Sequence, residues 1–466
     1  MIRYFIFVLT VLFFCVSAFD TAFSSARKIY SLDECLKIAL QNATTVNKAK
    51  NQKKFSDAEL LSGYGKFLPE ISVGADYYPY ENSYSYLVAP GIENTTLLSN
   101  VKSSSFKYYI RGTLNLFNGF SDYNSLKKSM SNSRYVESTI KYVKTQLAYD
   151  VIKNYYQVAL NKKIYEIQQN NYDLSLKRLA QIKQKVAVGE LSNADLMQQE
   201  AKVSLDLVEV VKSKNDLENS KLSLISKMLI DPVEEYDFID PKKTSDTNIN
   251  LYKNLDSLVS IAKKKRQDLI ASGYKEDSYK YSLREAKGGY YPKINLVAQL
   301  SSNAITYDNV EINNVRQNIS ELPSTADQLG DNLGFMYGFE LKWKIFDQFL
   351  TNLNVQKEKV NYLNSGLERQ ELWHNIQSEI VKARNEYNSS IQSLMAAHSS
   401  LKSAKTAYDI IMQRYDLGAS DYVDLTEAQK NMNNAMSQLV QSEYNLEFQK
   451  VILSYLIGVL NVDAYE

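Results

Sequence analysis

The chain has 466 residues with 54 Lys or Arg and 53 Asp or Glu, so its formal net charge is +1. This balance argues against a protein that neutralises nucleic-acid phosphates with a basic surface. A mean hydropathy of −0.35 with 44% hydrophobic residues excludes a polytopic helical membrane protein and a disordered chain. Two His and two Cys leave almost no material for a metal site or a Cys/His catalytic pair.

Turn-forming residues are scarce. The chain holds 16 Gly and 7 Pro, well below the usual shares of about 7% and about 5%. A chain of this length with so few of them predicts long uninterrupted helices rather than several compact domains.

The N-terminus is typical of a secretory signal peptide. Arg3 supplies the positive charge, and an apolar run follows from Phe5 to Val16 that is too short to span a bilayer. Cleavage is expected after Ala18, with Ala26 as the second choice. An uncleaved anchor and a lipoprotein modified at Cys15 are the alternatives. Either way the protein is exported.

The rest of the chain contains two copies of one unit. Leu32-Asp33 recurs as Leu255-Asp256, and Gly189 recurs as Gly418. We divide the chain into a signal peptide (1–18, or up to 26), repeat 1 (27–230), a linker (231–250), repeat 2 (251–460) and a tail (461–466). Each repeat is predicted to contain a first helix, then a β-hairpin (69–118 and 292–346), then a helical hairpin (121–230 and 350–458).

Heptads support the helical hairpins. Apolar or aromatic residues recur every seven positions in both repeats, which is typical of helices packed as a left-handed coiled coil. The series are Val151, Val158, Tyr165, Tyr172, Leu179 and Val186, then Leu196, Val203, Val210, Leu217 and Leu224, and their counterparts in repeat 2, from Ile380 to Tyr415 and from Leu425 to Leu453. Gly189 and Gly418 are predicted to end the outgoing helices. Ser192-Asn193 and Ser420-Asp421 are predicted to offer the caps of the returning ones. The remaining Cys35 lies on an apolar helical face and is predicted to be a buried thiol.

Alternating segments separate the helical parts. The clearest alternation places Phe335, Tyr337, Phe339, Leu341, Trp343 and Ile345 on one face and Met336, Gly338, Glu340, Lys342 and Lys344 on the other. Runs of about ten residues with this period have the length of transmembrane β-strands. We expect the polar face to line a barrel through Arg111, Glu340, Lys342 and Lys344. A half-buried soluble sheet is the alternative.

Four such strands cannot close a barrel. An open sheet edge in lipid leaves backbone groups unpaired, at several kcal/mol each. The barrel must therefore be shared between copies of the chain, with eight strands for two copies and twelve for three. Physical reasoning alone does not choose between them.

The whole exported chain resembles the TolC family of outer-membrane efflux and type I secretion channels. The resemblance rests on the duplicated unit and on its ordered motifs, which are Ser31–Asn42, Phe67–Ile71, Arg414–Gly418 and Tyr422–Leu425. It implies a mainly helical homotrimer with a shared twelve-stranded barrel in the outer membrane and a tunnel of twelve helices in the periplasm. It also implies that the loops 81–104 and 302–333 face the exterior.

The resemblance also implies a function without bond chemistry. Such a protein conducts small molecules or proteins to the exterior and depends on a periplasmic adaptor protein and an inner-membrane transporter. It is therefore not expected to be an enzyme or to hold a cofactor or metal. The alternative is an exported coiled-coil protein with a structural or adhesive role, which accounts for the heptads but not for the alternating segments.

Gate residues follow from the resemblance alone. The family's latch tyrosine matches Tyr415 and its acidic partner matches Asp195, while the acids that line the closed tip match Asp424 and Glu427. Ser420 stands where some members have a latch arginine. Gly189, Ser192, Gly418 and Asp421 mark the tips that would contact the adaptor. Core packing for Tyr415, and helix capping for Asp195 and Asp424, are the alternatives.

A catalytic site finds no support in the sequence. No paired acids, nucleophile motif or phosphate loop stands out. His374 and His398 lie far apart on one predicted helix, without the spacing of metal ligands. Both are expected to be solvated or core side chains.

Overall fold

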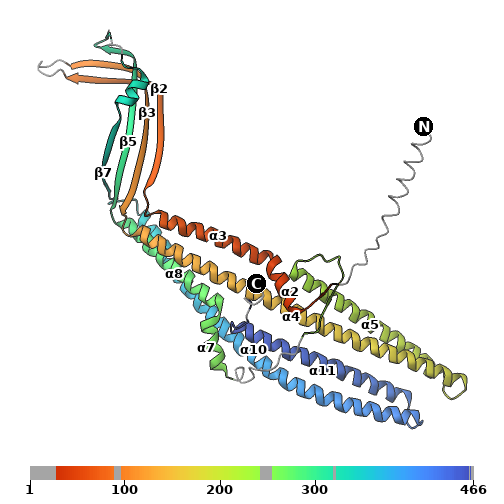
Figure 1. Cartoon of the computed structure of the whole chain (residues 1–466). Helices are drawn as coiled ribbons and strands as arrows, with labels where there is room; N and C mark the ends of the chain where they lie inside the picture. Colours follow the sequence, from red (N-terminus) through yellow and green to blue (C-terminus); the bar gives the residue numbers. More distant parts are fainter. Residues whose placement is uncertain (1–27, 89–95, 242–253, 319–321, 461, 463–466) are drawn as a thin grey trace, which may run out of the picture. The chain divides into compact units, whose positions relative to one another are not determined.

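A computed structural model describes residues 28–88, 96–241, 254–318, 322–460 and 462 (Figure 1). The predicted signal peptide, the part of the linker from residue 242 onward and most of the tail lie outside the described residues. Contacts divide the chain into a helical unit (Met1–Lys50, Ser138–Ile270 and Leu372–Glu466) and a sheet unit (Asn51–Glu137 and Ala271–Glu371). Among the described helices, none combines the length and the apolar content needed to cross a membrane.

Two long helical hairpins dominate the chain. Helix α4 (Ser121–Ala187) is followed by α5 (Asn193–Met228), and α10 (Leu350–Asp416) is followed by α11 (Tyr422–Leu456). In Figure 1, α5 returns along α4, and α11 returns along α10. The outgoing helices each have 67 residues and end just before Gly189 and Gly418. Both glycines have positive φ, +80° and +72°, which confirms the predicted left-handed ends.

The heptads face the interior of the helical unit. None of these heptad positions in either repeat is exposed. Some of them belong to two cores at equivalent places in the repeats. The first holds Val151 and Leu224, and the second holds their counterparts Ile380 and Leu453. Cys35 is buried in the first core, as predicted.

The first helix of each repeat is broken, which the sequence reading missed. Helix α2 (Leu32–Asn42) is followed by α3 (Thr44–Gly65), and α7 (Leu255–Lys265) by α8 (Gln267–Lys287). The two breaks, at Ala43 and Arg266, occupy equivalent places in the duplication. At both, ψ turns to an extended value, 121° and 116°. We call these breaks the elbows.

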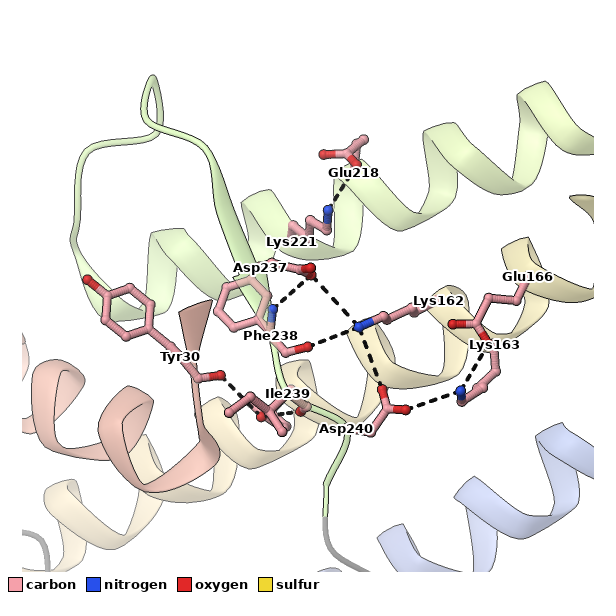
Figure 2. A network of polar contacts seen from close by, with 11 residues as sticks. Tyr30, Lys162, Lys163, Glu166, Glu218, Lys221, Asp237, Phe238, Ile239 and Asp240 are labelled. Carbon is pink, nitrogen blue, oxygen red and sulfur yellow. Dashed lines mark hydrogen bonds and ion pairs between the residues drawn. The ribbon is translucent and has the colours of Figure 1, made fainter. Parts of the chain in front are cut away.

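The linker is partly structured. Strand β4 (Tyr236–Phe238) pairs in parallel with β1 (Lys28–Tyr30), and both Tyr236 and Phe238 are buried in the first core. Figure 2 shows how α4 holds this segment: Lys162 donates to the Phe238 carbonyl at 3.3 Å, and Lys163 lies 3.1 Å from Asp240. Three residues of alternation are too few to reveal a strand, so the sequence predicts only a polar run here.

The sheet unit carries four antiparallel strands in the order β2–β3–β5–β7. They are β2 (Glu70–Val88), β3 (Thr96–Phe117), β5 (Lys293–Ile312) and β7 (Gly334–Lys342). Short β6 (Val315–Arg316), α9 (Thr325–Asp331) and the 3-10 turn η1 (Gly288–Tyr290) complete the unit.

The register confirms the predicted faces. One row across the sheet is Ile71, Gly112, Ala298 and Tyr337, and the adjacent row on the other face is Ser72, Arg111, Gln299 and Met336. Apolar side chains therefore gather on one face and polar side chains on the other.

Two boundaries of the predicted strands are wrong. Much of the predicted loops 81–104 and 302–333 is strand. Strand β2 continues past Pro79 to Val88, β3 already begins at Thr96, and β5 continues to Ile312. A bulge near Pro79 interrupts the pairing of β2 with β3. Many cross-strand pairs in these extensions join a polar to an apolar residue, such as Tyr84 with Asn100 and Ser103 with Tyr307. The extensions therefore lack the alternation that marks a sheet with one apolar face. The last strand stops at Lys342. Lys344 therefore follows the strand instead of lying on its polar face.

Candidate functional site

The returning helices begin with side-chain caps at the two tips. The Ser192 hydroxyl accepts a hydrogen bond from the Asp195 backbone N–H at 3.3 Å, and the Asp195 carboxylate accepts one from the Ser192 N–H at 3.1 Å. At the second tip, Asp421 accepts from the Asp424 N–H at 2.8 Å, and the Ser420 hydroxyl donates to the Asp424 carboxylate at 2.9 Å. The predicted caps are thus confirmed, and Asp195 and Asp424 contribute to them.

The two acids of the second tip share one exposed face of α11. Asp424 and Glu427 are three positions apart and both exposed, so they lie one above the other. Both border a groove of about 520 Å³ between α10 and α11, and Glu427 also borders a groove of about 550 Å³ between α5 and α11. Carboxylates placed this way attract cations when several copies surround one axis.

Tyr415 is half-buried and its hydroxyl, within the described residues, has no hydrogen-bond partner. Burial raises the pKa of this phenol, and the negative charge of Asp195 raises it further, while Arg178 opposes the rise. Asp195 therefore lies close enough to act on Tyr415 electrostatically. The Asp195 carboxylate already accepts hydrogen bonds from Ser192. Because its pKa is raised, Tyr415 keeps its proton, and its hydroxyl remains a free donor.

A buried polar cluster above the tips escaped the sequence reading. The Tyr422 hydroxyl donates to Gln199 at 2.6 Å, and the Gln199 amide donates to the Ser175 carbonyl at 2.9 Å. The guanidinium of Arg178 donates to Gln429 at 3.1 Å. These contacts join α4 and α5 to α11.

The sequence did hold a signal for this cluster. Three positions after each of the first four apolar heptad residues, α5 carries a second row of residues. This row should also face a partner helix. Its members are Gln199, Asp206, Ser213 and Ser220, and all four are polar yet buried. A polar residue at such a position marks a buried hydrogen bond.

The predicted barrel residues lie on the polar face of the sheet, with one exception. Arg111 lies opposite Gln299, Glu340 opposite Asn295, and Lys342 opposite Lys293. Arg111, Glu340 and Lys342 are exposed. Lys344 follows the end of β7 and does not belong to this set.

The chain matches a known family. Residues 258–459 match the family described as outer membrane efflux protein. Over 441 residues the chain is 19% identical to outer membrane protein TolC of Escherichia coli (strain K12), which covers 95% of this chain and 85% of that protein. The chain is therefore similar to TolC along most of its length, and its second half is similar to the efflux-protein family.

Two further proteins are similar to this chain. TolC of Vibrio cholerae is 21% identical over 446 residues, which covers 96% of this chain and 94% of that protein. The crystal structure of the Campylobacter jejuni CmeC outer membrane channel has the same fold, with a TM-score of 0.73, 17% identity, and coverage of 92% and 85%. The names of these relatives and of the matching family place those proteins in the outer membrane.

Proposed function

We propose that this protein is the outer-membrane channel-tunnel of a tripartite efflux pump or a type I secretion system. It would work as a homotrimer that conducts small molecules or proteins from the periplasm to the exterior. A periplasmic adaptor protein and an inner-membrane transporter would supply the cargo and the energy.

One observation carries this proposal: the sheet is incomplete in a way that a membrane barrel shared between chains would complete. Its apolar face is exposed, with Val73 and Tyr337 each 76% accessible. The outer edges of β2 and β7 pair with no strand among the described residues. Lipid covers such a face, but it cannot satisfy an open edge. Three copies would supply twelve strands, within the range of closed membrane barrels.

The helical hairpins supply the periplasmic part of the proposal. Three copies of the two hairpins would enclose a tunnel of twelve helices. The tips, marked by Gly189, Ser192, Gly418 and Asp421, would meet the adaptor. In vivo crosslinking from Ser192 or Asp421 would capture the adaptor, and a probe on the exposed Lys382, far from the tips, is the matched control.

The tip residues would form the gate. We propose that Tyr415 and Asp195 act as a latch between the hairpins, and that Asp424 and Glu427 from three copies form acidic rings in the aperture. Ser420 bonds to Asp424 within one chain, so it does not replace a latch arginine that reaches a second helix. The gate would then depend on contacts elsewhere.

Planar-bilayer recording tests the channel. Purified protein should insert with stepwise conductance and migrate in detergent as a heat-sensitive trimer. A soluble chain without conductance steps would instead support the exported coiled-coil alternative.

A further inference from the structure

The start of α11 is bonded to α5 and α4 through a chain of side chains that are almost fully buried. Ser175 is 3% exposed, Gln199 is 2% exposed and Tyr422 is 7% exposed. Gln199 accepts from the Tyr422 hydroxyl at 2.6 Å, and its amide nitrogen donates to the Ser175 carbonyl and hydroxyl at 2.9 and 3.0 Å. We call this set the hairpin bridge.

Its place in the helices gives the bridge mechanical importance. Tyr422 is the first residue of α11, directly after the Asp421 cap, and Gln199 lies in the second turn of α5. The bridge therefore joins the two hairpins at the level where each one turns back. A groove of about 550 Å³ lies between α5 and α11 beside Tyr422. Apolar packing between the hairpins is consequently incomplete here.

A second connection lies nearby. Arg178 of α4 donates to Gln429 of α11 at 3.1 Å and to the hydroxyl of Tyr408 of α10 at 3.4 Å. Arg178 follows Ser175 by three positions, so both lie on one face of α4. Gln429 follows Tyr422 by two turns. The two connections together resist both separation and sliding of the hairpins.

Buried polar bonds suit this task better than apolar contacts do. Apolar surfaces tolerate small slips at little cost, whereas a buried amide without its partners loses the full benefit of its hydrogen bonds. A single buried polar residue between helices is known to select one register. By contrast, the exposed tip is weakly joined, because the Tyr415 hydroxyl is unpartnered within the described residues and Ser420 bonds only within its own turn.

We infer that Gln199 and Tyr422 are positioning residues for the aperture: their buried hydrogen bond holds the two hairpins together, and opening requires that it break. This inference rests on the proposed channel function. It adds to the latch proposed at the tips a buried bridge, one to two turns further inside, that also holds the closed arrangement.

The test uses a double variant that removes the bond without leaving a buried group unpaired. In Gln199→Leu/Tyr422→Phe both partners become apolar at nearly constant shape, so the melting temperature should stay near that of the wild type. Ser175 can then bond to its own helix backbone. Tyr422→Phe alone should lower the melting temperature, because the Gln199 oxygen loses its donor.

In bilayers, the double variant should spend about tenfold more time in high-conductance states, the effect of losing one buried hydrogen bond. Ser213→Ala is the matched control, since Ser213 is equally buried but bonds only to Val210 of its own helix. Wild-type gating in a double variant of normal melting temperature would overturn the inference.

A distance measurement separates this inference from the channel proposal. Spin labels at Glu190→Cys and Ala419→Cys report the spacing of the two tips, in labelled protein diluted with unlabelled copies. Burial raises the pKa of the native Cys35 thiol to about 12, so it stays unlabelled. The double variant should widen and broaden the distance distribution. An unchanged distribution would refute the bridge, whereas a wild type without conductance would refute only the channel.

Discussion

At the scale of single residues, the duplicated unit allows each strained backbone position to be compared with its counterpart. Gly119 and Gln348 are equivalent, and both have positive φ, +66° and +59°. Gly119 is required by space as well, because a Cβ there would lie 2.6 Å from the Gly288 carbonyl. Gln348 is exposed and carries a Cβ, which is unfavourable in the left-handed region.

Gln348→Gly should therefore stabilise the protein by about 1 kcal/mol, the usual cost of a left-handed non-glycine residue. Thermal melting in detergent measures this as a higher midpoint. Gly119→Ala is the reciprocal control and should lower the midpoint. An unchanged or lower midpoint for Gln348→Gly would show that the left-handed backbone is not strained at this position.

Asp424 is the residue on which ion preference should depend most. It is exposed at the start of α11, and three copies around one axis would form a ring of carboxylates. Asp424→Asn should reduce the preference for cations in single-channel recordings, while Glu209→Gln, an exposed acid in mid-helix, should not. Unchanged selectivity in Asp424→Asn would remove Asp424 from the conduction path.

At the scale of elements, the helices depend on what happens at their ends. The hydrophobic heptads fix which face of a long helix is buried, but they do not fix where it begins or breaks. Caps decide the beginnings at Ser192 and Asp421. The elbows are held by side chains that donate to the last carbonyl of a returning helix. Asn42 donates to the Met228 carbonyl at 3.3 Å, and Arg266 donates to the Leu456 carbonyl at 3.3 Å.

Ser192→Ala should destabilise the first tip by about 1 kcal/mol, because it removes the cap of α5. Hydrogen exchange should rise at positions 193–196 and stay unchanged at the second tip, which provides an internal control. Exchange that rises equally at both tips would indicate a global effect instead of local loss of the cap.

Arg266 should matter far more than an ordinary ion-paired arginine. Its side chain is 9% exposed, and it bonds to both oxygens of Asp268 at 3.0 Å. Arg266→Ala would leave that carboxylate buried without this partner, at a cost of about 3–5 kcal/mol. Melting measurements should contrast this with Arg369→Ala, whose pair with Glu276 is exposed and contributes at most about 1 kcal/mol.

At the scale of the whole molecule, the sheet is the part that a single chain leaves unfinished. Phe339 and Glu340 are neighbours in β7 on opposite faces, and both are exposed. If the apolar face meets lipid, the same new side chain should have opposite consequences at these two positions.

Phe339→Arg should impair assembly into the outer membrane, since an arginine facing lipid at mid-depth costs about 2–4 kcal/mol. Glu340→Arg should assemble normally and shift ion selectivity toward anions. Trimer yield from outer-membrane fractions and bilayer recordings measure the two effects. Equal yields would mean that the apolar face does not meet lipid.

Local patterns account for most of the elements. The scarcity of Gly and Pro, the heptads and the alternation locate the hairpins and the faces of the strands, because periodicity is a local property of the chain. The strand extensions beyond Pro79 were missed because polar and apolar residues are mixed along them. Lys344 was misplaced because the alternation continues after the pairing has stopped.

The sequence by itself therefore determined the duplication, the long helices, the capped tips and the two faces of the sheet. Only the tertiary structure decided where the first helices break, that the linker contributes a strand, and that Gln199, Tyr422 and Arg178 meet. These features depend on side chains that are distant in the sequence, as Gln199 of repeat 1 and Tyr422 of repeat 2 are. No local period can encode which of many polar residues will share one buried hydrogen bond.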